Sequence, residues 1–102
     1  MNFEKIAQLR QYLSVKHSLP GRLRVKFSKS ILTDKIALEL IESGLDSPEA
    51  VTRTKLNMFS RTLLIEYDTK KVSQNLLEGL INALSDQDAG QYVARLHGEL
   101  YD

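Results

Sequence analysis

The two histidines are the side chains of this sequence best suited to bind a metal ion or haem. His17 lies just before Pro20 and Gly21, which we expect to turn the chain into a strand, and the other histidine is His97. Imidazole nitrogens bind zinc, copper and nickel, and they are axial ligands of haem iron. Two ligands do not complete a tetrahedral site, so two unrelated surface histidines are the simpler interpretation. A metal or haem site at His17, with or without His97, remains the alternative.

A row of basic residues is the second feature that could bind a partner. Over residues 22–27, basic and apolar side chains alternate, which predicts a strand with one buried face and one basic face. Residues 50–57 form a second predicted strand, of irregular register, whose basic side chains extend this row. The predicted basic row consists of Arg22, Arg24, Lys26, Arg53 and Lys55. Leu64, on a third predicted strand, lies among these polar residues and could start a contact with a partner or with a second copy of the chain.

The basic row allows more than one interpretation. A solvated surface, with Glu66 paired to the row across the strands, is the simplest. The alternatives are a docking surface for an acidic protein partner and a surface for nucleic acid. RNA-binding domains that use an open sheet stack bases on aromatic side chains. The outward positions of the third strand hold Thr62, Leu64 and Glu66 instead, so nucleic acid is the least favoured partner.

The composition fits one folded domain. The chain has 102 residues, of which 42% are hydrophobic and 26% are charged. Its 14 basic and 13 acidic residues leave a net charge of +1, so bulk charge does not draw the protein to nucleic acid or to a membrane. No apolar run approaches the ~20 residues that a membrane-spanning helix needs. We therefore expect a soluble, cytoplasmic protein without membrane insertion.

The sequence motifs do not indicate an enzyme. The chain contains no cysteine, which excludes disulfides, thiolate nucleophiles and thiolate metal sites. No serine lies in a G-x-S-x-G motif, and no G-x-x-x-x-G-K phosphate loop is present. We therefore expect a non-enzymatic protein.

Hydrophobic periodicity predicts a helical N-terminus followed by a βαββαβ order. The expected helices are 3–13, 34–43 and 71–85, and the expected strands are 22–27, 50–57, 61–68 and 91–97. This order is typical of the α+β class and of the ferredoxin-like fold, in which both helices cover one face of an antiparallel sheet. We assign residues 1–13 to the N-terminal helix and residues 14–102 to the ferredoxin-like domain. The turn at 57–60 carries Met58 and Phe59, which either contact a partner or fold back onto the core.

The segment 91–97 fits two patterns. Its apolar residues alternate as in a strand, although Val93, Leu96 and Leu100 also have helical spacing. We expect a strand. In the ferredoxin-like order this strand is the antiparallel neighbour of residues 22–27, which would bring the two histidines towards the same end of the sheet.

Two runs of the sequence resemble a known family. HSLPGRLRV (17–25) and VTRTKLNMFSRTLLIEYD (51–68) are similar to the cysteine-less branch of the heavy-metal-associated (HMA) superfamily. The resemblance spans residues 14–85 and implies the same ferredoxin-like fold. It also implies a module that occurs alone or ahead of metal-transporting P-type ATPases. Ordinary HMA domains hold copper or zinc with a C-x-x-C loop, and residues 28–33 carry hydroxyl groups there instead, which are poor ligands for Cu(I).

These observations together predict an HMA-like accessory module linked to metal transport or homeostasis. We expect it to act by protein–protein docking, through the open sheet face or the N-terminal helix, rather than by thiolate metal transfer. A metal-transporting P-type ATPase and a second copy of the chain are the partners to consider. The alternative is a metal- or haem-binding protein that uses His17, with or without His97. Only that alternative requires a cofactor, either haem or a divalent metal.

Overall fold

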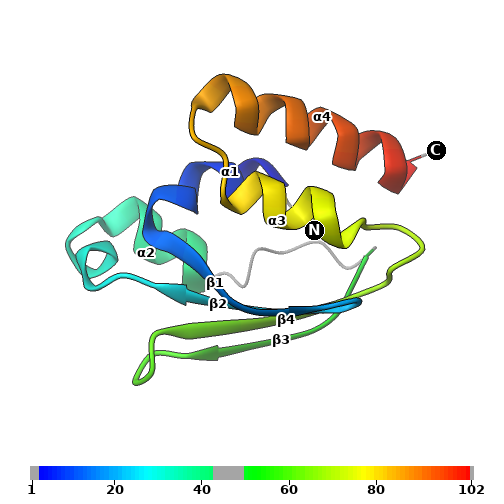
Figure 1. Cartoon of the computed structure of the whole chain (residues 1–102). Helices are drawn as coiled ribbons and strands as arrows, with labels where there is room; N and C mark the ends of the chain where they lie inside the picture. Colours follow the sequence, from blue (N-terminus) through cyan, green and yellow to red (C-terminus); the bar gives the residue numbers. More distant parts are fainter. Residues whose placement is uncertain (1–2, 43–49, 102) are drawn as a thin grey trace.

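The computed structural model describes residues 3–42 and 50–101, which form a four-stranded antiparallel sheet and the helices that cover one of its faces (Figure 1). The helices are α1 (Phe3–Leu9), α2 (Lys35–Glu42), α3 (Gln74–Ile81) and α4 (Asp86–Tyr101). The strands are β1 (Leu13–Leu19), β2 (Arg22–Phe27), β3 (Val51–Asn57) and β4 (Thr62–Tyr67), in the order β1-β2-β4-β3. Two short 3-10 helices are η1 (Arg10–Tyr12) and η2 (Lys29–Thr33). The predicted α+β class, with an antiparallel sheet and an N-terminal helix, is confirmed.

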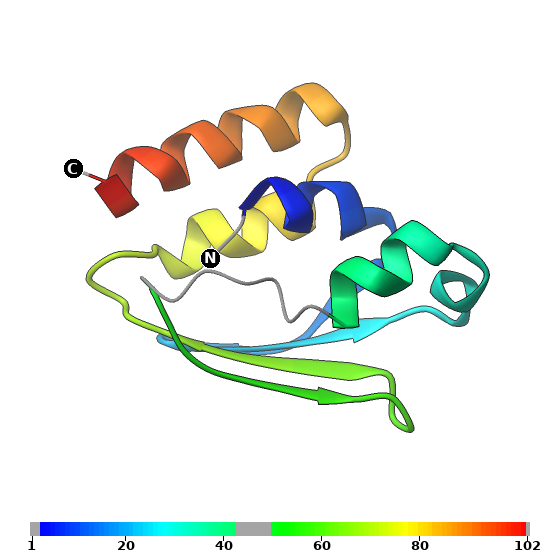
Figure 2. The ribbon, with the colours of Figure 1, turned by 180° about the vertical axis from the view of Figure 1, so that it is seen from behind.

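The elements lie in three layers. The sheet is the first layer, α1, α2 and α3 lie against one of its faces, and α4 lies over α1 and α3 (Figures 1 and 2). No helix of the described residues covers the opposite face of the sheet, which we call the open face. In this part of the chain, no helix combines the length and the apolar character needed to cross a membrane.

The alternating pattern of β2 builds the centre of the core. Leu23, Val25 and Phe27 are at most 1% exposed, whereas the basic residues between them are exposed. Leu63 and Ile65 of β4 pack into the same buried cluster. Burying a large apolar side chain contributes about 1.5–3 kcal/mol, so the inner face of these two central strands stabilises the sheet and fixes its register.

The N-terminal helix is part of the same core. Phe3, Ile6 and Leu9 are at most 1% exposed and belong to the buried cluster that includes the sheet residues. The helix is shorter than predicted, because α1 ends at Leu9 and β1 begins at Leu13. The apolar face of α1 is therefore already buried within the molecule.

The prediction of a strand at 91–97 is wrong, because these residues lie in α4. Leu96 is fully buried, and Val93 and Leu100 pack partly buried against the core, so the helical spacing is the one that the fold uses. The strand position beside β2 is taken by β1, residues that the sequence analysis left before the first strand. A hairpin closes this pairing over a two-residue turn, at a much lower entropic cost than pairing with residues near position 95.

The predicted turn at Pro20 and Gly21 is confirmed, and it connects β1 to β2. Gly21 has φ of +82°, a conformation that side-chain-bearing residues rarely adopt. A Cβ atom at this position would also lie 3.2 Å from the carbonyl oxygen of Tyr67. Both constraints favour glycine at this corner of the sheet.

Tyr12 links η1 to the start of α2 through Asp34. The Tyr12 hydroxyl donates to Asp34 Oδ2 at 2.6 Å, and the Ala37 N–H donates to Asp34 Oδ1 at 3.0 Å. These hydrogen bonds, the one from Tyr12 first, hold the pKa of Asp34 below its ordinary value of 3.8. The ionised carboxylate therefore caps α2.

We expect Tyr12→Phe to lower the free energy of unfolding at neutral pH and to matter less in acid. Because folding lowers the pKa of Asp34, the ionised carboxylate stabilises the fold above pH 3.8, and this contribution is lost as the pH falls through the lower folded value. The stability gap between wild type and variant should therefore narrow from neutral pH to about pH 3. Urea unfolding at both pH values measures this gap. The control is the same substitution, Tyr12→Phe, in an Asp34→Asn background. If wild type and Tyr12→Phe differ by the same free energy of unfolding at both pH values, the prediction is contradicted.

Candidate functional site: the basic open face

Strand register decides which side chains reach the open face. Side chains of Cα partners on antiparallel strands project to the same side of the sheet. The residues of β1 and β4 that pair with Arg22, Arg24 and Lys26 of β2 therefore also lie on the open face, and the same holds for the β3 partners of those β4 residues. The outward side chains are Ser14, Lys16, His17 and Leu19 of β1, Arg22, Arg24 and Lys26 of β2, Thr62, Leu64 and Glu66 of β4, and Arg53, Lys55 and Asn57 of β3. All five residues of the predicted basic row thus lie on one face.

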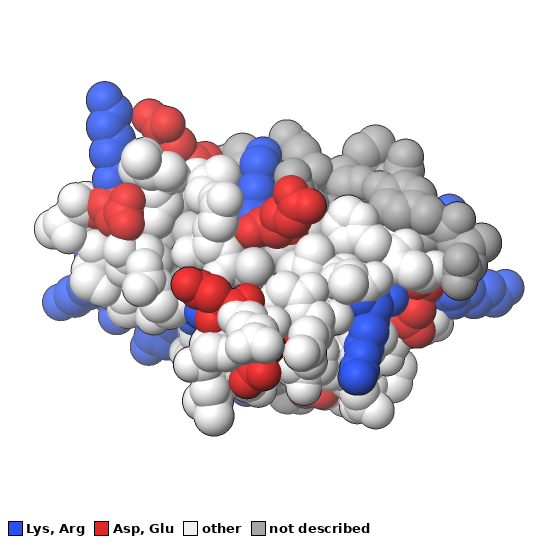
Figure 3. Space-filling model, turned by 90° about the horizontal axis from the view of Figure 1, so that it is seen from above, with Lys and Arg blue, Asp and Glu red and all other residues white. Residues whose placement is uncertain are grey.

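Charge is strongly segregated onto the open face. It carries six of the 14 Lys and Arg residues of the chain but only one of the ten Asp and Glu residues that the structure describes. The opposite side of the molecule, over α4, shows basic and acidic residues intermixed (Figure 3). The net charge of +1 therefore conceals a positive sheet face, because the other described residues carry slightly more acidic than basic groups.

One ion pair lies on this face. Arg53 Nη1 and Glu66 Oε1 are 4.0 Å apart, so the cross-strand role predicted for Glu66 is confirmed with Arg53 as the partner. The other five cations of the face have no ion-pair partner within residues 3–42 and 50–101. Their charges repel one another at the spacing of neighbouring strands, which favours the approach of an anionic group.

Two β-bulges shape the face at its edges. The register of β1 shifts between Val15 and His17, so Lys16 and His17 are both exposed side by side. Strict alternation would have turned His17 towards the core. The register of β3 shifts between Val51 and Arg53, which confirms the irregular register predicted for that strand. Bulges re-aim side chains at sheet edges, and here they add basic groups to the open face.

A pocket of about 290 Å³ lies in the open face, towards the β3–β4 turn. Its lining comprises Lys16, Arg24, Lys55, Asn57, Ser60, Thr62 and Leu64. Leu64 lies between its cross-strand partners Arg24 and Lys55 and is only 7% exposed. This leucine, expected to be an exposed contact point, is therefore the buried base of a basic pocket. Lys16 was absent from the predicted basic row because residues 14–18 were not predicted to form a strand, although Leu13 and Val15 alternate with polar neighbours there.

The turn between β3 and β4 projects an apolar tip beyond the sheet. Phe59 is 98% exposed and Met58 is 41% exposed, so of the two alternatives for this turn, Phe59 does not fold back onto the core. The turn points away from the helical layers in both views (Figures 1 and 2). The basic face thus has one large aromatic side chain at its margin.

The structure does not bring the two predicted histidine ligands together. His17 is exposed on the open face opposite Arg24, whereas the ring of His97 on α4 meets the ring of Phe3 edge-on, with centroids 5.5 Å apart. The sheet and the layer of α1 and α3 separate them. Across the described residues, no group of three or more histidine or carboxylate side chains is placed to hold a metal ion. The metal or haem hypothesis therefore depends on His17 alone and stays a prediction.

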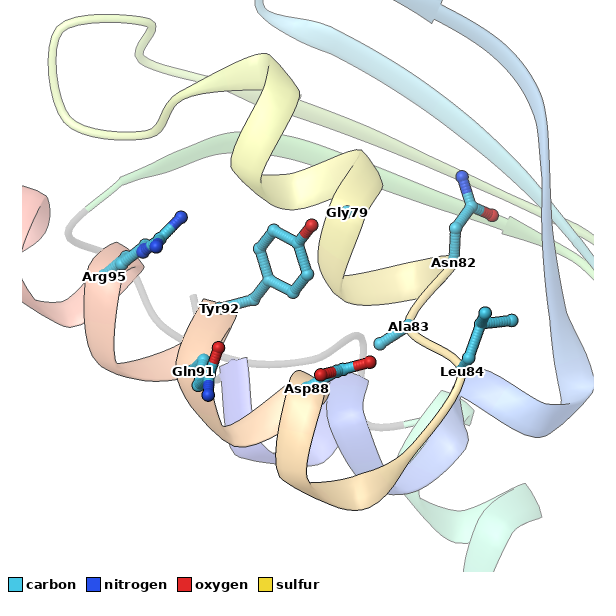
Figure 4. Close-up of a pocket in the computed structure, with 8 residues that line it drawn as sticks. All are labelled: Gly79, Asn82, Ala83, Leu84, Asp88, Gln91, Tyr92 and Arg95. Atoms are coloured by element: carbon cyan, nitrogen blue, oxygen red, sulfur yellow. The ribbon is translucent and has the colours of Figure 1, made fainter.

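A second cavity, of about 450 Å³, lies between α3 and α4 (Figure 4). The ring of Tyr92 leans over Gly79 at its inner wall, and Asp88, Gln91 and Arg95 border it from α4. A Cβ atom on Gly79 would lie 2.4 Å from Tyr92 Cε1, so glycine permits the close approach of the two helices. Sequence reasoning did not find this cavity because it expected a strand in place of α4.

Comparison with known protein families finds a match that covers most of the chain. No curated protein and no solved structure is significantly similar to this chain. The model of the family described as heavy metal associated domain 2 matches residues 1–90, which confirms the resemblance found in the sequence and extends it over α1 and the start of α4. Because the match covers most of its length, the chain belongs to the heavy metal associated domain 2 family.

Proposed function

We propose that this chain is a non-enzymatic accessory module of metal transport or homeostasis that docks a protein partner on its open face. Family membership supports the link to metals. A chain without cysteine cannot offer the thiolates that hold Cu(I), so transfer of metal through thiolates is not its mechanism. The observation that carries the proposal is the face that no described helix covers, on which the described residues place six cations and a single carboxylate.

The chemistry of the face selects an acidic partner. Complementary charge accelerates association and fixes orientation more than it adds affinity. The apolar contribution comes from the margin, because Leu64 is buried while Phe59 is 98% exposed. Aromatic side chains are common anchors of interfaces. We therefore expect an acidic partner surface with an apolar recess that accepts Phe59.

A second copy of the chain fits this face poorly. A two-fold symmetric contact would place the same patch against itself, and each patch carries a marked positive excess. The alternative docking element, α1, has its apolar residues in the core. We propose a metal-transporting P-type ATPase as the partner, because modules that resemble this sequence occur ahead of such pumps.

Charge reversal on the open face tests this proposal. Arg22→Glu combined with Lys26→Glu should weaken binding to the cytosolic domains of such an ATPase by about tenfold or more, because two attractive pairs become repulsive. Lys29→Glu combined with Lys35→Glu is the matched control, since both residues are exposed on η2 and α2 and the charge change is the same. Biolayer interferometry at two salt concentrations measures both affinities. Equal weakening by the control pair, or no binding by the wild type, would refute the proposal.

A further inference from the structure

The pocket in the open face gathers cationic groups from three different strands. Lys16 comes from the bulge of β1, Arg24 from β2 and Lys55 from β3. None of the three has an ion-pair partner in the described part of the chain, and no carboxylate lines the pocket. Positive charges on three residues around one pocket repel one another, and an anion between them would offset that repulsion.

The uncharged groups of the pocket also offer donors. The Ser60 N–H donates to Asn57 Oδ1 at 3.1 Å, which leaves the Nδ2 amino group of Asn57 to donate elsewhere. Ser60 Oγ and Thr62 Oγ1 are 2.8 Å apart. One hydroxyl hydrogen is used within this pair, and the hydrogen of the accepting hydroxyl remains to donate to a ligand.

Two further features strengthen this environment for an anion. Leu64 forms an apolar base that keeps water from one side, and charge-assisted hydrogen bonds are stronger where water is excluded. The nearest carboxylate of the face, Glu66, lies outside the pocket and pairs with Arg53. It therefore opposes anion binding less than an unpaired carboxylate would.

From this arrangement we propose that the pocket binds a phosphate group, either as inorganic phosphate or as a phosphate monoester. A phosphate carries between one and two negative charges at neutral pH and accepts hydrogen bonds on several oxygens in different directions. Oxygens in several directions suit a pocket whose donors come from several strands and a turn. A planar carboxylate, in contrast, is best bound by the two parallel N–H groups of a single arginine. The site goes beyond partner docking and does not depend on it. The docking test alters Arg22 and Lys26, which do not line the pocket, so either proposal can fail without the other.

Titration of the ¹⁵N-labelled full chain with sodium phosphate at constant ionic strength tests the site. We expect saturable shifts of the amide resonances of Asn57, Ser60 and Thr62. O-phosphoserine should produce the same shifts if the phosphate group alone is recognised. Vesicles of phosphatidylcholine with phosphatidic acid form a third arm, which distinguishes a lipid source of the same phosphate chemistry from a soluble one.

Two arginines of the same strand supply the variant and its control. Arg24→Gln removes a guanidinium that lines the pocket and should weaken phosphate binding by about tenfold or more. Arg22→Gln removes the same charge two residues away, outside the pocket, and should weaken binding by about twofold or less. Both residues are exposed, and the same spectra show that each variant is folded. Equal weakening by the two variants, shifts that do not saturate, or binding to the vesicles alone would each overturn the proposal.

Discussion

Phe3→Ala is expected to lower the free energy of unfolding by about 3–5 kcal/mol, more than any other substitution proposed for this chain. Phe3 is 0% exposed, and its helix, α1, lies in the layer between the sheet and α4 (Figure 1). Truncation removes the buried ring and leaves a cavity that the two flanking layers cannot easily fill. It also removes the edge-on contact with the ring of His97. Denaturant unfolding followed by circular dichroism measures the change.

The neighbouring residue provides the control for this prediction. Glu4 is exposed on the same helix, so Glu4→Ala should change stability by about 0.5 kcal/mol or less. If Phe3→Ala costs no more than Glu4→Ala, the N-terminal helix is not an integral part of the core. That result would favour the division of the sequence into a separate N-terminal helix and a domain that begins at residue 14.

Gly79→Val is expected to destabilise the protein by about 2 kcal/mol, although valine is a better helix former than glycine. The new Cβ atom would lie 2.4 Å from Tyr92 Cε1, and the two γ-methyl groups of valine have little rotamer freedom in a helix. Tyr92 would have to move into the cavity between α3 and α4, which loosens the packing of α4 (Figure 4). Urea unfolding measures the loss.

Two further variants make this prediction specific. Gly90→Val on α4 places the same side chain where nothing lies within 4 Å of the new Cβ atom, so it should be neutral or slightly stabilising. In a Tyr92→Ala background, Gly79→Val should lose most of its cost, because the clashing ring is absent. A cost that persists unchanged without the Tyr92 ring would show that the close approach of these two side chains is not its cause.

Much of the sheet was predictable because its signals are local. The alternation along residues 22–27 places three apolar side chains in the core and three basic ones outside, as the structure shows. The turn at Pro20 and Gly21 likewise depends on residues close in sequence. The basic row was predictable for the same reason, since a period of two assigns each residue to a face.

The two ends of the sheet domain were harder to predict because each contains competing patterns. Residues 91–97 have both strand and helix periodicity, and the helix prevails because α1 and α3 together offer an apolar surface that Leu96 can fill. β1 forms because β2 presents an unpaired edge directly after a tight turn. The apolar surface of α1 and α3 cannot be inferred from the sequence of residues 91–97. In the same way, the unpaired edge of β2 cannot be inferred from the sequence of β1. His17 and His97 were expected to lie at the same end of the sheet. They do not, because that expectation required a strand at His97.

The sequence by itself determined the α+β class, the family resemblance and the segregation of basic residues onto one face. These depend on periodicity and residue type, which are properties of short segments. Only the tertiary structure decided that Leu64 is the buried base of a pocket and that Lys16, Arg24 and Lys55 surround it. These residues come from four strands, and a bulge in β1 sets the position of one of them. Pairing register across strands is a long-range property, so the pocket appears only once the sheet is assembled.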